Sequence, residues 1–314
     1  MEPRPPRRLS QRRRDEALHD GGPVFGTLIV SPSPFWPKVL GDSGLDFVFI
    51  DTEHIALDRS QVSWMCRTYK AMGLPPLVRI VSPSPYEATM VLDDGAAGVV
   101  APYIEQVEQV QQLRGASKLR PLKGQRLDDA LAGQPLPGEL ADYAPGFNQD
   151  NLLIINIESV PAVDNLDRIL DVPGIDSVLI GPHDLSSNLG VPEQYDDPTF
   201  LKTAETIFTK ARAKGVGAGI HAWGDIASQA RFVDMGANLL IHKADIIFFK
   251  NGIRTELAEI REERDELNED LAAHLNKKEA DLLVDPVSYT HLRAHETPEQ
   301  LVFGGGVVKK KGGG

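Results

Sequence analysis

The chain has 314 residues, of which 41% are hydrophobic and 25% are charged, which is typical of a globular protein with a sizeable core. The formal net charge of −12 argues against non-specific binding to nucleic acids or anionic membranes, because both require a positive surface. The single cysteine excludes an intrachain disulfide, and no apolar run approaches the roughly 20 residues of a membrane span, so we expect a cytoplasmic protein.

Residues 1–22 are rich in arginine and proline and lack apolar periodicity, which predicts a disordered arm. From residue 23 to residue 252, short apolar runs alternate with helix-length segments. The eight runs are Val24–Val30, Phe47–Ile50, Leu77–Ile80, Gly98–Ala101, Leu152–Ile157, Ser177–Ile180, Val216–Ile220 and Leu239–Ile241. Near-continuous apolar runs are typical of parallel strands that are buried on both faces. Eight strand–helix repeats predict a (β/α)₈ TIM barrel, with a doubly wound open sheet as the alternative.

The longest gap between runs, residues 102–151, predicts an insertion after the fourth strand that covers the mouth of the barrel. Residues 253–284 predict a C-terminal helix that is charged except for one apolar stripe. Such a stripe requires a partner, either the outside of the barrel or another subunit. Residues 285–314 continue no pattern, and we interpret them as a non-native or disordered tail.

Polar residues follow four of the apolar runs. Asp51-Thr-Glu-His54 follows the second run, Arg79 lies near the end of the third, Asn156-Ile-Glu158 closes the fifth, and Gly181-Pro-His-Asp184 follows the sixth. The active site of a (β/α)₈ barrel lies at the carboxyl ends of its strands. These side chains are therefore predicted to surround one mouth.

Two carboxylates in this set, those of Glu158 and Asp184, belong to neighbouring predicted strands. A pair of carboxylates with remaining positions open to water and substrate is what a hard divalent cation such as Mg²⁺ or Mn²⁺ prefers. The simpler interpretation is that Glu158 caps the following helix and Asp184 ends a strand.

The cationic and imidazole groups also have two interpretations each. Arg79 presents a fork that can grip a substrate carboxylate, or it pairs with Asp51 or Glu53. His54 can move protons near neutral pH, or it is merely exposed on a loop. Asp93 lies at the end of a predicted helix, where it could orient His54 or simply end the helix.

Several of these segments together resemble one family. They are Phe-Ile-Asp-Thr-Glu-His at 49–54, Val-Arg at 78–79, Ile-Glu-Ser at 157–159 with Asp-Asn-Leu at 164–166, and Leu-Ile-Gly-Pro-His-Asp-Leu-Ser at 179–186. Between about residue 26 and residue 252 the chain resembles the HpcH/HpaI class II pyruvate aldolases. The resemblance implies a pyruvate-type barrel that assembles as a homo-hexamer. A terminal helix is exchanged between neighbours in such an assembly, and the helix after Gly252 is the candidate.

The resemblance also implies roles for individual residues. Glu158 and Asp184 would bind Mg²⁺, Mn²⁺ or Co²⁺, and Arg79 would hold the developing enolate oxygen. His54, paired with Asp93, would be the acid and base, while Asp51 and Glu53 would support the loop. Asn156 and His183 stand where the family often has glutamine and a small residue, and both would reshape the substrate pocket.

The expected activity is metal-dependent aldol cleavage of a 4-hydroxy-2-oxo acid through an enolate, which gives pyruvate and an aldehyde. Oxaloacetate would be accepted as a related 2-oxo acid. Two alternatives stay open: a citrate-lyase-type enzyme that acts on a CoA thioester, and a non-catalytic barrel that binds a metabolite.

Overall fold

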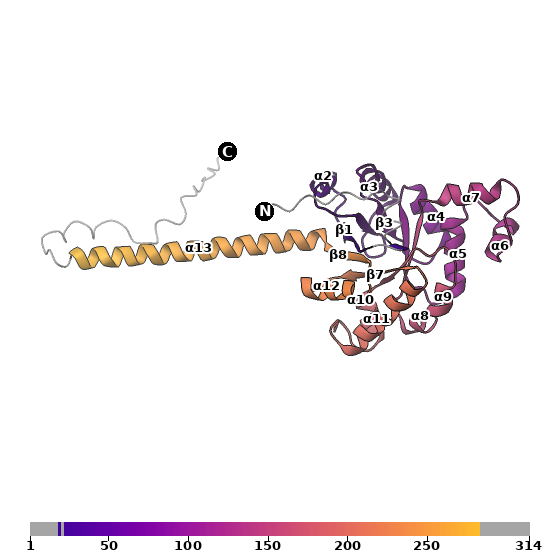
Figure 1. The fold of residues 1–314 in the computed structure, drawn as a ribbon. Helices are drawn as coiled ribbons and strands as arrows, with labels where there is room; N and C mark the ends of the chain where they lie inside the picture. The colour runs from indigo at the N-terminus through magenta and orange to yellow at the C-terminus, as the bar shows by residue number, and fades with distance from the viewer. Residues whose placement is uncertain (1–17, 20–21, 283–314) are drawn as a thin grey trace, which may run out of the picture. The chain divides into compact units, whose positions relative to one another are not determined.

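The computed structural model describes residues 18–19 and 22–282, and it confirms the predicted barrel (Figure 1). Eight parallel strands pair in chain order from β1 to β8, and β8 closes on β1. The strands are β1 (Val24–Leu28), β2 (Phe47–Asp51), β3 (Pro76–Arg79), β4 (Gly98–Ala101), β5 (Leu152–Asn156), β6 (Ser177–Ile180), β7 (Gly217–Ala222) and β8 (Leu239–Ala244). Each strand coincides with one predicted apolar run.

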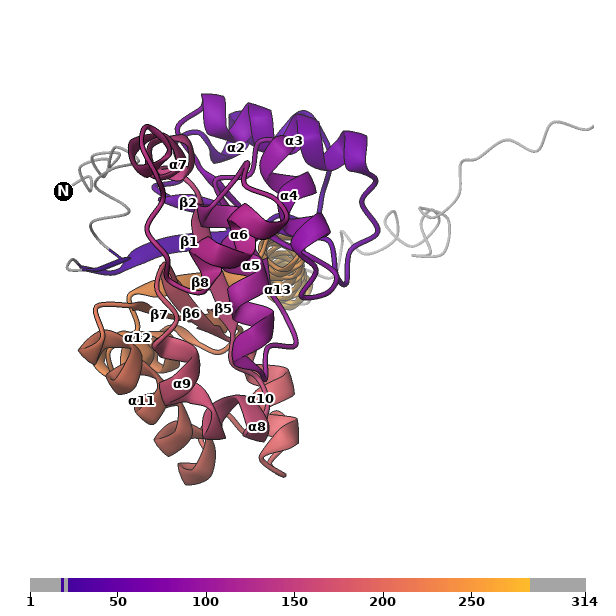
Figure 2. The ribbon, with the colours of Figure 1, turned by 90° about the vertical axis from the view of Figure 1, so that its right-hand side faces the viewer.

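Helices surround the strands (Figure 2). They are α2 (Trp36–Leu40), α3 (Arg59–Ala71), α4 (Pro85–Asp93), α5 (Val107–Lys118), α6 (Gln125–Leu131), α7 (Leu140–Asn148), α8 (Val160–Asp164), α9 (Leu166–Leu170), α10 (Pro182–Asn188), α11 (Pro198–Ala213) and α12 (Ile226–Asp234). Side chains that accept a hydrogen bond from the first turn fix several helix starts, as Asp58 does for α3 and Ser84 for α4.

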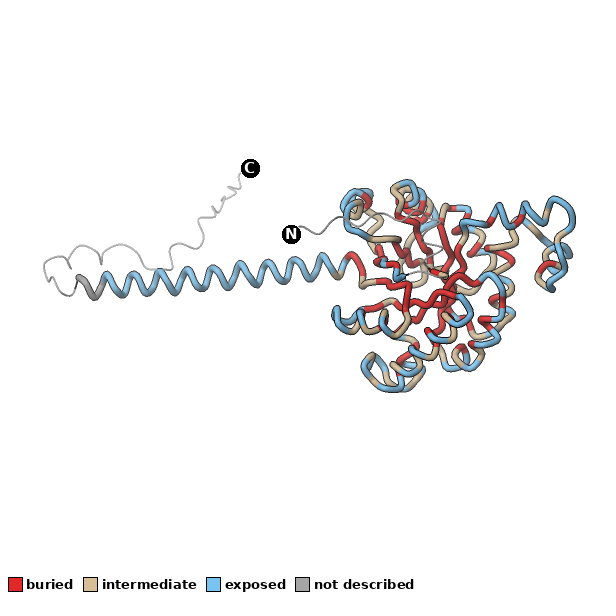
Figure 3. Tube along the Cα trace, in the orientation of Figure 1, coloured by how far each residue is buried: buried red, intermediate tan, exposed pale blue. Residues whose placement is uncertain are grey.

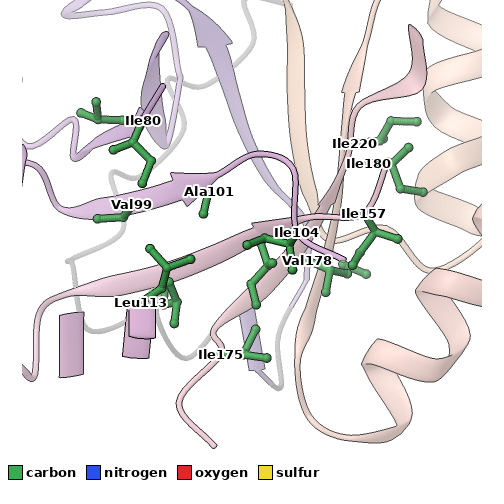
Figure 4. Close-up of a cluster of buried hydrophobic side chains, with 14 of the residues drawn as sticks. Ile80, Val99, Ala101, Ile104, Leu113, Ile157, Ile175, Val178, Ile180 and Ile220 are labelled. Atoms are coloured by element: carbon green, nitrogen blue, oxygen red, sulfur yellow. The ribbon is translucent and has the colours of Figure 1, made fainter. Parts of the chain in front are cut away.

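The buried apolar side chains form two separate cores because successive residues of a strand point to opposite faces. In β2, Val48 and Ile50 belong to the outer core between the strands and the helices, whereas Phe47 and Phe49 belong to the inner core. Figure 4 shows part of the outer core, and Figure 3 shows the buried strands at the centre of the barrel unit. The inner core fills the barrel, so its interior is packed up to the layer where polar side chains begin.

The amino end of the barrel is closed by Leu18, whose side chain is buried in the inner core with the first residues of β1 and β8. The Leu18 carbonyl accepts hydrogen bonds from Arg212 and Asn238, and His19 Nδ1 lies 2.8 Å from the Gly215 carbonyl oxygen. The predicted disordered arm, residues 1–22, therefore extends too far along the chain, because the buried Leu18 side chain holds this part of it against the barrel. The rest of the arm, residues 1–17 and 20–21, lies outside the described residues.

Beyond Tyr103, which stays at the carboxyl end of the strands, the segment predicted to cover the mouth lies elsewhere, and that prediction is wrong. Helix α5 is an ordinary barrel helix that returns the chain to the amino end of the strands, and α6 and α7 follow it there before β5 begins. Asn148 and Asn151 fasten the segment to the end of α5 through hydrogen bonds to the carbonyls of Arg120 and Ser117. The gap is long because of these two added helices.

The last helix, α13 (Asp245–Leu282), begins at Asp245 rather than at residue 253 and continues through Gly252. A glycine inside a helix costs about 1 kcal/mol, which long flanking helical segments tolerate. The compact barrel unit ends at Lys250, and a second unit starts at Asn251. No described helix has both the length and the apolar character that a membrane span requires. The predicted tail, residues 285–314, lies outside the described residues.

Candidate active site

The candidate site begins where the inner core ends. Phe49, Leu77 and Ile154 point into the barrel, so the residues two positions later on the same strands also point inward. These residues are Asp51, Arg79 and Asn156, at the carboxyl ends of β2, β3 and β5. The alternation of the strands therefore brings the predicted polar residues to one end of the barrel interior.

Asp51 and Arg79 form a buried ion pair across neighbouring strands. Arg79 Nε and Nη2 donate to the two Asp51 oxygens at 2.9 and 2.6 Å, and the β2–β3 register sets the two residues opposite each other. Burial alone would raise the pKa of the Asp51 carboxyl, but the hydrogen bonds and the charge of Arg79 outweigh it and hold that pKa below its usual range. The pair is thus fixed in its charged state.

The guanidinium of Arg79 also has a side that the protein leaves open. Its Nε lies 3.1 Å from Glu53 Oε2, and its carbon stands 5.8 Å from the centre of the Phe49 ring. Among the described residues, Nη1 makes no hydrogen bond, and Arg79 lines the central cavity. Arg79 can therefore donate to an anionic oxygen in the cavity while Asp51 holds its orientation.

Glu158 is a buried carboxylate that receives one donor on each oxygen. The Tyr103 backbone N–H donates to Oε1 at 2.9 Å, and Asn156 Nδ2 donates to Oε2 at 2.9 Å. Burial raises the pKa of Glu158 despite these bonds, and the negative charges of Asp184 and Glu53 add to the rise. Glu158 thus lies where added positive charge would be favourable.

The carboxylates of Glu158 and Asp184 approach each other over Gly181. A Cβ placed on Gly181 would lie 2.8 Å from Glu158 Oε2 and 3.4 Å from Asp184 Oδ2, so the two oxygens cannot be farther apart than the sum of these distances. Asp184 lies in the first turn of α10, directly after β6. The structure therefore brings the two predicted metal ligands together.

The oxygens around Glu158 suit a hard divalent cation. Asn156 Oδ1 is buried and has no hydrogen-bond partner, an arrangement that costs free energy unless another group satisfies the oxygen. Among the residues whose side chains the structure describes, 18–19 and 22–278, no three His, Cys, Asp or Glu side chains gather as a complete metal cage. A cation at this site would thus have only part of its shell from carboxylates and would need water or substrate oxygens for the rest.

His54 lies at the mouth, but Asp93 does not. The His54 side chain is 59% exposed, and its Nε2 is 3.7 Å from Glu53 Oε1. Asp93 ends α4 at the amino end of the barrel, where its carboxylate pairs with Arg120. Within one chain the predicted pairing of Asp93 with His54 is wrong, because a barrel helix ends at the opposite side of the barrel from the strand ends.

The site opens into a cavity of about 850 Å³. Two residues of α10 and its following loop, His183 and Glu193, stand at its edge with His183 Nδ1 3.4 Å from Glu193 Oε1. Tyr195, His221 and Trp223 add aromatic surface. Burial lowers the pKa of His221 to about 4, which keeps its ring neutral. Arg79 supplies the only guanidinium or ammonium group among the described residues that line the cavity.

Tyr103 is a site residue that the sequence analysis missed. It follows β4 with a positive φ of 55°, which turns its N–H toward Glu158. The pKa of its hydroxyl rises to about 12 because of a hydrogen bond to Glu53. The strand-end argument used for four other runs applies equally to the run 98–101 and would have identified Tyr103.

Comparisons with known proteins agree with this fold. A family model described as HpcH/HpaI aldolase/citrate lyase matches residues 30–245. The 2-keto-3-deoxy-L-rhamnonate aldolase of Escherichia coli (strain K12) is 30% identical over 244 residues, which are 77% of this chain and 91% of that protein. The crystal structure of an HpcH/HpaI aldolase from Desulfitobacterium hafniense DCB-2 superposes with a TM-score of 0.68 at 27% identity and covers 78% of this chain and 95% of that one. The citrate synthase SbnG gives a TM-score of 0.68 at 28% identity, with 80% and 98% of the two chains covered.

Proposed function

Because this chain belongs to the HpcH/HpaI aldolase/citrate lyase family, we propose that it is a carbon–carbon lyase that cleaves a 4-hydroxy-2-oxo acid into pyruvate and an aldehyde. The relative from Escherichia coli is named as an aldolase of a 2-keto-3-deoxy acid, which supports this class of substrate. The observation that carries the proposal is the convergence of Glu158 and Asp184 at the end of the barrel where Arg79 faces the cavity.

Glu158 and Asp184 would hold a divalent cation, with Asn156 Oδ1 next to it. When bound, Mg²⁺, Mn²⁺ or Co²⁺ supplies the Lewis acidity that polarises a 2-oxo acid and offsets the charge of its enolate. The unpartnered Asn156 oxygen and the raised pKa of Glu158 both favour added positive charge at this position. This support comes from the chain's own polar groups and holds for any of the three cations.

Arg79 would stabilise the reacting oxygen of the substrate. Asp51 and Glu53 fix its guanidinium, so donation from Nη1 needs no reorganisation when charge develops. A single preorganised donor of this kind is typically worth about 2.7–4 kcal/mol of barrier. His54, exposed at the mouth beside Glu53, would exchange the proton of the aldol hydroxyl with solvent.

The aldehyde half of the substrate would be uncharged. Glu193, Tyr195 and Trp223 line the cavity and would face this half of the substrate, and Arg79 is the one guanidinium or ammonium group among the described lining residues. Arg79 already pairs with Asp51 and Glu53, and the 2-oxo acid would use its open side. A second carboxylate on the aldehyde would meet the negative charge of Glu193 and would have no free guanidinium or ammonium group to pair with.

Release of pyruvate from 4-hydroxy-2-oxo acids tests the proposal. Protein stripped of metal is assayed with and without Mg²⁺, Mn²⁺ or Co²⁺, beside Glu158→Gln and the exposed control Glu139→Gln. We expect metal-dependent cleavage in the wild type and the control, and at least a 100-fold loss in Glu158→Gln. Undiminished cleavage after complete removal of metal would refute the mechanism.

The same assay run as a condensation tests the aldehyde. Pyruvate is offered with lactaldehyde and glycolaldehyde, which are uncharged, and with succinic semialdehyde, which carries a carboxylate. We expect kcat/KM to be at least tenfold higher for the uncharged aldehydes. Equal or better use of succinic semialdehyde would contradict the argument from the charge of the cavity.

A further inference from the structure

Residues 251–278 form a helical segment whose side chains are exposed on every side (Figure 3). A single helix in water is marginal without a partner for its apolar face, because most helical stability comes from packing. The family model ends at residue 245, before this segment begins.

From residue 253 to residue 271, the large apolar residues of the segment follow a heptad repeat, with spacings of four and three residues in alternation. In a heptad written abcdefg, Leu257, Arg264 and Leu271 occupy a positions. Ile253, Ile260 and Leu267 occupy d positions. The five apolar residues of this seam are between 43% and 63% exposed. A repeat of this kind is the seam of a coiled coil, in which the same seam of another helix covers it.

The charges beside the seam indicate which helix fits and in which direction. The g positions are acidic, with Glu256, Glu263 and Asp270, whereas the e positions hold Arg254, Arg261 and Asn268. In a parallel pair each g position faces the e position of the next heptad, so Glu256 meets the partner subunit's Arg261, and no like charges meet between g and e positions. In an antiparallel pair g positions face g positions, and the acidic residues would repel one another.

Arg264 in the seam supports the same arrangement. In a parallel, in-register pair a positions face a positions, so the two Arg264 side chains lie together and can turn outward to the neighbouring Glu263 of the partner subunit. In an antiparallel pair Arg264 would instead face an apolar d position. A single polar residue at an a position is a known means of fixing register.

From these observations we infer that residues 253–274 pair with the same segment of a second copy of this chain in a parallel, in-register coiled coil. The partner is another copy, because the helix is complementary to itself: its acidic g positions face its own basic or neutral e positions, and Arg264 faces Arg264. The pairing is independent of the reaction proposed for the barrel.

Site-specific cross-linking in the full chain tests this inference. His274 lies at a d position near the end of the seam, so His274→Cys should form a disulfide with its own copy in a parallel pair. Glu269→Cys, at an outward f position, is the matched control. Cys66 is buried, which raises its thiol pKa to about 12, so the introduced thiol reacts alone.

We expect at least tenfold more disulfide-linked dimer for His274→Cys than for Glu269→Cys. Adding Leu257→Asp and Leu271→Asp to His274→Cys should abolish the dimer, whereas adding Ala258→Asp and Ala272→Asp on the outer face should leave it. The melting temperature of the barrel should be the same in all variants, which excludes unfolding as the cause. If His274→Cys gives no dimer, or the seam variants leave its yield unchanged, the inference is overturned.

Discussion

Replacement of Gly181 by alanine tests whether Glu158 and Asp184 act together. The backbone of Gly181 has φ −84° and ψ 96°, which alanine adopts without strain, so the only perturbation is the added methyl group. That methyl would lie 2.8 Å from Glu158 Oε2, whereas ordinary contact begins at 3.4 Å. The carboxylate must therefore move from 2.8 to at least 3.4 Å, a shift of about 0.6 Å.

A shift of this size strains both hydrogen bonds of Glu158 and changes its distance from Asp184. Loss of orientation at a ligating side chain typically costs about 10–100-fold in metal affinity or activity. We expect Gly181→Ala to lower the affinity for Mn²⁺ by that factor and kcat/KM in parallel. Because no apolar packing is lost, the melting temperature should change little.

Isothermal titration with Mn²⁺ and the rate of pyruvate release are the two measurements. Gly146→Ala is the matched control. Gly146 lies in helix α7, and a Cβ added there would meet nothing within 4 Å. Its metal affinity and activity should equal those of the wild type. If a folded Gly181→Ala variant binds Mn²⁺ and turns over substrate as the wild type does, then the carboxylates over Gly181 do not form a metal site.

Three further predictions concern stability. Asp51→Asn removes one partner of a buried ion pair and should lower the free energy of unfolding by about 3 kcal/mol in urea titrations; an unchanged midpoint would mean that Arg79 is held by other groups. The hydrogen bond to Asp176 raises the pKa of His19, so its stabilisation is complete below pH 6.5 and is lost as the pH rises through the folded-state pKa. His19→Ala should therefore lower the free energy of unfolding, measured in urea titrations, more at pH 6 than at pH 9; the difference should be less than about 1 kcal/mol because the ring is partly exposed. Burial lowers the pKa of His221 to about 4, so between pH 6.5 and pH 4 the imidazole takes up a proton only in the unfolded chain. The free energy of unfolding should therefore fall by roughly 1 kcal/mol per pH unit as the pH drops through this range. His221→Gln should remove this slope in pH-dependent melting curves, and a slope that persists would assign it to another group.

The barrel could be predicted from the sequence because its eight strands are buried on both faces and read as apolar runs. Asp51, Arg79 and Asn156 could be placed for the same reason, since each lies within one residue of the end of a run and is the last residue of its strand. The position of each strand in the sequence and its direction in the barrel are enough to place these residues at the mouth.

Two of the errors have one physical cause, which is the direction of the helices. Asp93 ends helix α4, and most of the segment 102–151 lies in or after helix α5. Each of these helices carries the chain away from the mouth, so within one chain their ends lie far from it. The order of Leu18 was also missed, because one buried side chain produces no periodic signal in an arginine-rich stretch.

The barrel separates the groups that would perform the chemistry from those that would select the aldehyde. Asp51, Arg79 and Asn156 are rooted in the strands, whereas Glu193 and Tyr195 follow α10 and Trp223 follows β7. Directed evolution confined to these three positions can therefore change which aldehyde is accepted and leave the reacting centre, including Asp184 on α10, intact. Libraries that reach into the strand ends would put folding and turnover at risk together.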